Sequence, residues 1–205
     1  VSTLVFTLSG SIMNGFIVIV LLVVGFLLLV NGRDIVKAIW TSERKYPSQR
    51  IDRGDYALTK PAGFKVSDES HLFMIQSANV TGAIAIVDGR RIQEEFNCAW
   101  AVVSVTSGDG IEICRGVAKE HSDEVLSESE EIVDGNRVLT ITAQRKTPAY
   151  FVIQTTHKAV MSLAHNKTYE LRVSTINNQP PKYGKAANQI LESFEVLPPA
   201  ASVAS

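Results

Sequence analysis

Residues 99–106 read AWAVVSVT, and this stretch gives the clearest strand signal in the chain. Val and Trp are enriched in strands because branched and aromatic side chains pack well on a pleated surface. The turn-forming residues Ser107-Gly108-Asp109-Gly110 follow at once and are expected to end the strand. We therefore expect a β-sheet at the centre of the fold.

Further strand candidates lie on both sides of this segment. They share short runs of apolar and branched residues bounded by polar turns, and they occupy residues 64–66, 83–87, 137–143, 149–156 and 168–175. Strands that follow one another along the chain favour an antiparallel sheet. The acidic stretch 122–131 interrupts the series and is predicted to be an exposed loop or a short helix.

Two helices are expected beside the sheet. Asp109 is placed to cap a helix over residues 111–119, in which Ile111, Cys114 and Ala118 face inward and Val117 is a further candidate. A second helix follows the break at Pro180-Pro181, and its apolar face comprises Ala186, Ala187, Ile190, Leu191 and Phe194. A sheet covered by helices predicts an α+β domain with a central antiparallel β-sheet flanked by helices.

Residues 12–30, IMNGFIVIVLLVVGFLLLV, carry no charge. A helix of this length spans about 28 Å, close to the roughly 30 Å thickness of a bilayer's hydrocarbon core. A buried core helix is rarely apolar on every face. A cleaved signal peptide has a shorter apolar run, about 7–15 residues, behind a basic start. We therefore predict one transmembrane helix, with anchor positions at Ile12, Phe16, Leu21, Gly25, Leu28 and Val30.

The residues after this span predict the domain boundaries. Trp40, Arg44, Lys45 and Tyr46 are candidate interface residues, because aromatic and basic side chains gather at membrane surfaces. Pro47 is expected to stop the juxtamembrane helix. The predicted parts are an anchor with its juxtamembrane helix over 1–46, a linker over 47–55, a soluble domain over 56–197 and a flexible tail over 198–205.

Composition excludes some functions. The formal net charge is −1 and no basic tract is interleaved with aromatic residues, so nucleic acid is not an expected partner. The chain outside the anchor suffices for one ordinary domain. Cys98 and Cys114 leave room for one disulfide, but two buried free thiols are the favoured state.

No catalytic motif is visible. The four histidines lack a partner motif, and there is no nucleophile elbow, phosphate-binding loop or zinc-protease motif. His157 and His165 flank one connection between strands and can meet across it, so a metal pair is an alternative to two exposed loop histidines. We assign no catalytic and no metal residues, and cofactor-binding residues stay unknown. A hydrolase or isomerase would need a pocket at His157 or His165 with a carboxylate nearby.

Several short motifs occur in a characteristic order along the soluble domain. They are Tyr56-Ala57-Leu58, Gly63-Phe64-Lys65, the segments 97–111, 149–153 and 167–171, Lys182-Tyr183, and the segment 193–196. This order resembles the PsbP family, the extrinsic photosystem proteins of the thylakoid lumen. The resemblance implies an α/β/α sandwich and a non-catalytic role at a photosystem. Lys182-Tyr183 stands where the family usually has Arg-Trp, and the anchor replaces a flexible N-terminal arm.

The resemblance and the anchor together predict a single-pass, non-catalytic subunit of a thylakoid photosystem supercomplex in the plastid. Its expected partners are photosystem core and antenna proteins and the lipid bilayer. No cofactor is intrinsic to this role, but chlorophyll, carotenoid or lipid contacts are possible at the anchor. A membrane-tethered assembly factor that binds transiently is the alternative.

The side of the membrane is predicted by two opposing signals. Basic residues follow the span and none precedes it, so the positive-inside rule favours the stromal side. The family resemblance favours the lumen. We expect the soluble domain in the lumen, with the stromal side as the alternative.

Overall fold

The computed structural model describes residues 42–69, 72–87, 90–177 and 179–199. They belong to a compact unit that begins at Ser42. The predicted anchor, with Ile12, Phe16, Leu21, Gly25, Leu28 and Val30, lies outside the described residues, and so does Trp40. Within those four ranges, no helix is both long and apolar enough to cross a bilayer.

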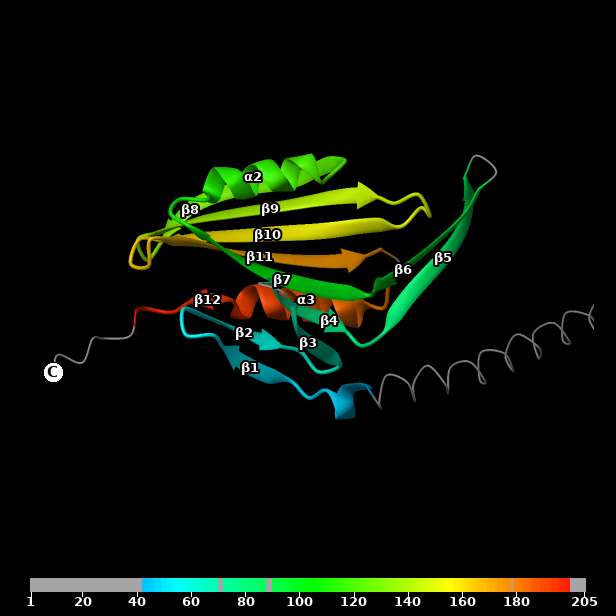
Figure 1. Ribbon diagram of the computed structural model, residues 1–205, viewed down its shortest axis with the longest axis horizontal. Helices are drawn as coiled ribbons and strands as arrows, with labels where there is room; N and C mark the ends of the chain where they lie inside the picture. Colours follow the sequence, from blue (N-terminus) through cyan, green and yellow to red (C-terminus); the bar gives the residue numbers. More distant parts are fainter. Residues whose placement is uncertain (1–41, 70–71, 88–89, 178, 200–205) are drawn as a thin grey trace, which may run out of the picture. The chain divides into compact units, whose positions relative to one another are not determined.

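A seven-stranded sheet forms the centre of the domain, with the order β3-β4-β7-β11-β10-β9-β8 (Figure 1). Every neighbouring pair in this sheet is antiparallel. Its strands are β3 (Phe64–Glu69), β4 (Leu72–Ser77), β7 (Ala99–Ser107), β8 (Glu124–Val133), β9 (Asn136–Lys146), β10 (Val152–Ser162) and β11 (Lys167–Ile176). The segment 99–106 is therefore a strand, as predicted, and it lies inside the sheet.

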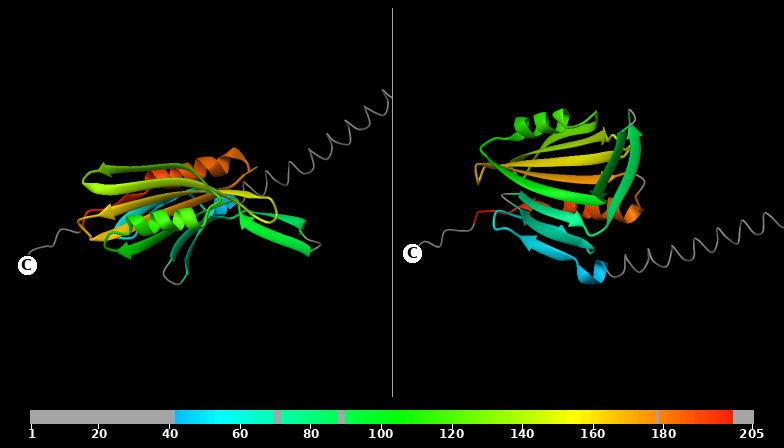
Figure 2. Two further views of the ribbon diagram at one scale, coloured as in Figure 1. Left: turned by 90° about the horizontal axis from the view of Figure 1, so that it is seen from above. Right: turned by 45° about the vertical axis from the view of Figure 1, so that its right-hand side comes forward.

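The two helices cover opposite faces of the sheet, as the view from above shows (Figure 2). Helix α2 (Ile111–Glu120) packs on β9 and β10, and α3 (Pro181–Ser193) packs on β7 and β11. Side chains alternate along β11, so that Tyr169, Leu171 and Val173 join the core under α3. Burying one large apolar side chain contributes roughly 1.5–3 kcal/mol, so these residues hold the layers together.

Two smaller sheets complete the domain. Strands β1 (Gln49–Asp52), β2 (Tyr56–Lys60) and β12 (Glu195–Val196) form a three-stranded sheet, and α3 packs against β2. Strands β5 (Val80–Val87) and β6 (Arg90–Asn97) form a hairpin that extends beyond one end of the main sheet (Figure 1).

Both predicted helices are confirmed. Ile111, Cys114 and Ala118 are the buried residues of α2, and Val117 is half-buried. Pro181 occupies the first turn of α3, where its missing N–H has no partner to lose. The helix buries Ala187 and Ile190 against the core.

Two element starts differ from the prediction. Gly110, and not Asp109, is the N-cap of α2. Asp109 lies one residue before the cap, and its carboxylate accepts a hydrogen bond from the Ile111 amide at 3.1 Å. The strand predicted from residue 149 begins at Val152, because a turn in which Tyr150 has φ of 66° comes first.

The prediction of a loop or short helix over residues 122–131 is wrong. The segment forms β8, which pairs with β9 at the edge of the sheet and is exposed along its whole length. An edge strand with both faces in water needs no apolar alternation, so periodicity gives no signal. Likewise, the segment predicted as a linker over 47–55 contains β1, whose Ile51 packs against the core.

Cys98 and Cys114 are both free and buried, as the favoured prediction states. Cys98 belongs to the core under α3, and Cys114 belongs to the core under α2. Because the sheet lies between these two cores, the two sulfur atoms cannot reach the short distance that a disulfide requires.

Candidate functional site

A row of hydrogen-bonded polar side chains crosses the sheet on the face that carries α2. Glu170 of β11 accepts a hydrogen bond from His157 Nδ1 of β10 at 2.9 Å and another from Ser104 Oγ of β7 at 3.1 Å. The His157 side chain is only 8% exposed and that of Glu170 only 10%. Burying such groups costs free energy unless they are paired, and this paired set inside the sheet is the candidate functional site.

The Glu170 carboxylate is ionised in this setting. Burial by itself raises the pKa of Glu170, but the hydrogen bond from His157 and the positive charge of Arg172 outweigh it and lower the pKa below its usual value. An ionised carboxylate can only accept hydrogen bonds, so His157 must carry its proton on Nδ1. The second ring nitrogen is then left for another partner.

A pocket of about 260 Å³ lies beside this row. It is bounded by the C-terminal end of α2 and by β7, β9, β10 and β11. The lining side chains that matter for recognition are Trp100, Val102, Ile153, Thr155, His157 and Arg172. His157 therefore faces the pocket on one side and Glu170 on the other.

Arg172 supplies the positive charge of the pocket. Its Nε atom is buried and has no hydrogen-bond partner among the described residues. The nearest carboxylate oxygen is Glu170 Oε2, at 3.8 Å from Nε, which is too far for a hydrogen bond. The guanidinium side chain is 32% exposed, so an incoming group can reach it.

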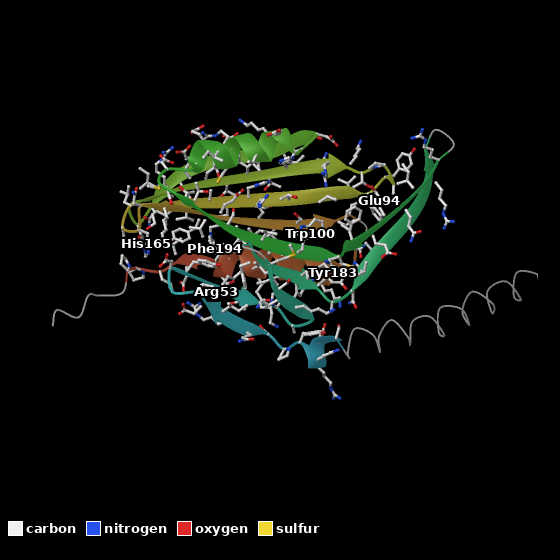
Figure 3. The ribbon with its side chains drawn as sticks, viewed as in Figure 1. Arg53, Glu94, Trp100, His165, Tyr183 and Phe194 are labelled. Atoms are coloured by element: carbon white, nitrogen blue, oxygen red, sulfur yellow. The ribbon has the colours of Figure 1, made fainter. Side chains whose placement is uncertain are left out.

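Aromatic side chains fix one end of the pocket. The Phe96 ring stacks on Trp100 at 6.4 Å between centroids, and Phe151 meets Phe96 edge-on at 5.7 Å. Glu94 of β6 accepts a hydrogen bond from the Ala149 amide at 3.0 Å. Figure 3 shows Trp100 and Glu94 toward the end of the sheet that carries the β5–β6 hairpin. The hairpin thus holds Trp100 in place through Phe96.

His165 does not join this site. It lies at the opposite end of the domain from Trp100 (Figure 3), where its Nε2 bonds the Leu197 carbonyl oxygen at 2.7 Å and its ring meets Tyr169 edge-on. The possible pairing of His157 with His165 is therefore wrong. Within the part of the chain that the structure describes, no three His, Cys, Asp or Glu side chains are grouped to hold a metal ion.

The candidate interface residues that the structure describes lie at the start of the compact unit. Residues 42–45 are helical, and Arg44 and Lys45 are exposed. Tyr46 is half-buried, and the Lys45 and Lys65 ammonium groups each lie 5.5 Å from its ring centroid. Their role at a membrane surface stays a prediction.

The sequence did contain a signal for the residues that were missed. Glu170 and Arg172 are two apart in TYELRV, where apolar residues occupy the alternate positions. On a strand, that spacing puts both charges on one face. Charged residues on one face of an inner strand are unusual and mark a candidate site.

The hydroxyl and thiol groups of this region are not arranged as nucleophiles. Thr155 Oγ1 and Ser174 Oγ bond each other at 2.8 Å, and Ser104 bonds Glu170 rather than His157. Burial raises the pKa of the Cys114 thiol to about 12, and the nearby Glu170 carboxylate adds to the effect. A thiol is nucleophilic only as thiolate, so Cys114 is inert at neutral pH. The arrangement suits ligand binding better than nucleophilic attack.

Comparison with known proteins supports the fold. No protein-family model and no curated protein matches the sequence. The solution structure of cyanobacterial PsbP from Synechocystis matches with a TM-score of 0.51 at 12% identity, over 73% of this chain and 92% of that chain. The fold is PsbP-like.

Two further solved structures show weaker similarity to this chain. The Mycobacterium tuberculosis protein LpqN, described as involved in cell envelope biogenesis, matches with a TM-score of 0.47 at 14% identity, over 76% of this chain and 95% of that chain. The Saccharomyces cerevisiae Ran-binding protein Mog1p matches with a TM-score of 0.44 at 9% identity, over 75% of this chain and 97% of that chain. The match to cyanobacterial PsbP supports the PsbP-like α+β class, and function must be argued separately.

Proposed function

We propose that this protein is a membrane-tethered, non-catalytic PsbP-like subunit of a thylakoid photosystem supercomplex. The observation that supports the proposal is the PsbP-like fold, because the match covers 92% of the cyanobacterial chain. The uncharged segment 12–30 supplies the tether. In this role the domain contacts photosystem core and antenna proteins and lies on the lumenal side. The anchor contacts lipid, with chlorophyll or carotenoid as further contacts.

A non-catalytic role is supported by the chemistry of the polar row. Among the described residues, no hydroxyl or thiol is hydrogen-bonded to His157. The sequence also lacks the motifs of common hydrolases. In this proposal the domain works by contact and not by turnover.

Copurification tests the proposal. Photosystem particles isolated in mild detergent should contain the full chain at about one copy per complex. A variant lacking residues 12–30 should be lost from them, and the full chain should resist extraction with alkaline carbonate. Protease treatment of sealed thylakoid vesicles should spare a lumenal domain.

A matched control separates tethering from specific contacts. In this control, residues 12–30 are replaced by an unrelated apolar helix of the same length. Retention of this chain in the particles assigns recognition to the folded domain, and its loss assigns recognition to the anchor. A full chain that migrates alone in native gels contradicts the proposal. A copy number far below one per complex favours the transient assembly factor.

One observation favours a second candidate, an enzyme that uses His157 as a general acid or base. His157 lines a pocket while Glu170 orients its ring, which is the arrangement that such a base requires. A screen of small esters and enolisable carbonyl compounds with the full chain and with His157→Gln tests it. Turnover that the variant loses would establish the enzyme in place of the non-catalytic role.

A further inference from the structure

We propose that the pocket beside the polar row binds a small organic carboxylate with a flat apolar body. Arg172 takes the carboxylate and Trp100 packs against the body. This inference is independent of the photosystem role, because it rests on the described residues of the pocket alone.

The carboxylate end of the ligand is recognised by Arg172. Its buried Nε lacks a hydrogen-bond partner among the described residues, and Glu170 Oε2 stays 3.8 Å away from it. Glu170 already accepts from His157 and Ser104, so it cannot turn toward Arg172 without losing one of those bonds. A guanidinium presents a planar fork that matches a carboxylate with two parallel hydrogen bonds. Because Nε itself is buried, the ligand carboxylate meets the exposed part of the guanidinium, which lines the pocket.

Other charges around the pocket favour an anion. Arg145, which lines the pocket from β9, adds a second positive charge. The Glu170 carboxylate is not among the residues that line the pocket, and its oxygens accept hydrogen bonds from His157 and Ser104. The oxygen-bearing side chains Thr155 and Ser174 bond each other and do not compete for the guanidinium.

The body of the ligand is recognised by apolar surface. Trp100, Val102 and Ile153 line the pocket, and Phe96 holds the indole ring from behind. Ligand pockets usually measure about 300–1,000 Å³. A volume of about 260 Å³ therefore suits a single-ring molecule and not a dinucleotide.

Ligand-detected NMR titration of the purified full chain in mild detergent tests this site, with benzoate as the probe and benzamide as its uncharged match. Benzoate should bind saturably and benzamide should not. Arg172→Gln should weaken benzoate binding at least about tenfold, the cost of one charge-assisted hydrogen bond. Arg91→Gln, which removes an exposed arginine of β6 outside the pocket lining, should leave binding unchanged.

A second variant keeps the test decisive if Arg172→Gln does not fold. Arg172→Lys retains the positive charge but loses the planar pair of N–H donors, so it should bind benzoate more weakly than the native chain. Equal binding of benzoate and benzamide overturns the proposal, because it shows apolar partition alone. Unchanged benzoate binding in both Arg172 variants overturns it as well. A negative result here leaves copurification with photosystems unaffected.

Discussion

Replacing His157 by alanine should destabilise the domain more than replacing Glu170 by glutamine, although the two side chains form one hydrogen bond. His157→Ala leaves an ionised Glu170 buried, with Ser104 as its remaining hydrogen-bond donor. Glu170→Gln removes the charge and can keep both contacts, because the amide oxygen accepts from His157 while the amide NH2 group donates to the Ser104 hydroxyl. The two variants therefore differ in whether a buried carboxylate is left with one hydrogen-bond donor fewer, because Arg172 lies 3.8 Å from Glu170 in both.

Magnitudes follow from the burial of the pair. Both side chains are about nine-tenths buried, so removing the His157 donor costs about 1.5–3 kcal/mol for the hydrogen bond to the ionised carboxylate, and the cavity left by the imidazole ring adds to this cost. The glutamine variant loses only the charge-assisted part of the bond, about 1–2 kcal/mol. In the double variant no carboxylate is left without the His157 donor, so its cost should fall below the sum of the single costs by at least about 1 kcal/mol.

Denaturant unfolding of the full chain in mild detergent, followed by far-UV circular dichroism, measures these differences. The midpoint should shift while the slope stays constant, because the surface exposed on unfolding does not change. His121→Ala is the matched control, since His121 is exposed and also lines the pocket. It should change the free energy of unfolding by less than about 0.5 kcal/mol.

Two results would refute this reasoning. Strictly additive single costs would mean that His157 and Glu170 are not coupled. A His157→Ala variant as stable as His121→Ala would mean that Glu170 is solvated or protonated in the folded state. Either outcome would remove the polar row as a distinct site.

Three further predictions concern acid stability, the core and the thiols. The pKa of Glu170 is lower in the folded chain than in the unfolded chain, so its stabilising contribution is present above the unfolded pKa and is lost as pH falls through the folded pKa. Glu170→Gln should therefore flatten the acid side of a plot of stability against pH. Equal acid slopes for the native chain and the variant would contradict this. Ile190→Ala should lower the free energy of unfolding by about 2–5 kcal/mol, because Ile190 is fully buried and leaves a cavity, whereas Leu163→Ala, at a side chain that is 70% exposed, should change it little in the same denaturant assay. Cys98 and Cys114 should both react with a thiol reagent after unfolding and only slowly before it, and a mobility shift on adding reductant to a denaturing gel would contradict two free thiols.

Much of the architecture could be predicted because its signals are local. In α3, Pro181 starts the helix, and Ala187 and Ile190 lie on one helical face, so a short window of sequence is sufficient. Segment 99–106 carries its own strand preference. By contrast, β8 has no apolar face, and only backbone pairing with β9 makes it a strand.

The candidate site could not be predicted in the same way, because its residues come from three strands. His157 and Glu170 meet because β10 and β11 pair in the register that places Ala159 opposite Glu170 and His157 opposite Arg172. Ser104 joins them because β7 pairs with β11 and places Ser104 opposite Glu170. A shift of one residue in either register would turn these side chains to the other face.

The amino-acid sequence by itself determined the α+β class, the two helices and most of the inner strands, because periodicity and turn residues act over a few positions. Only the tertiary structure decided that a buried histidine and glutamate share one face with an arginine that lines a pocket. The physical reason is that strand order and register are set by the burial of the whole core, and no single segment carries that information.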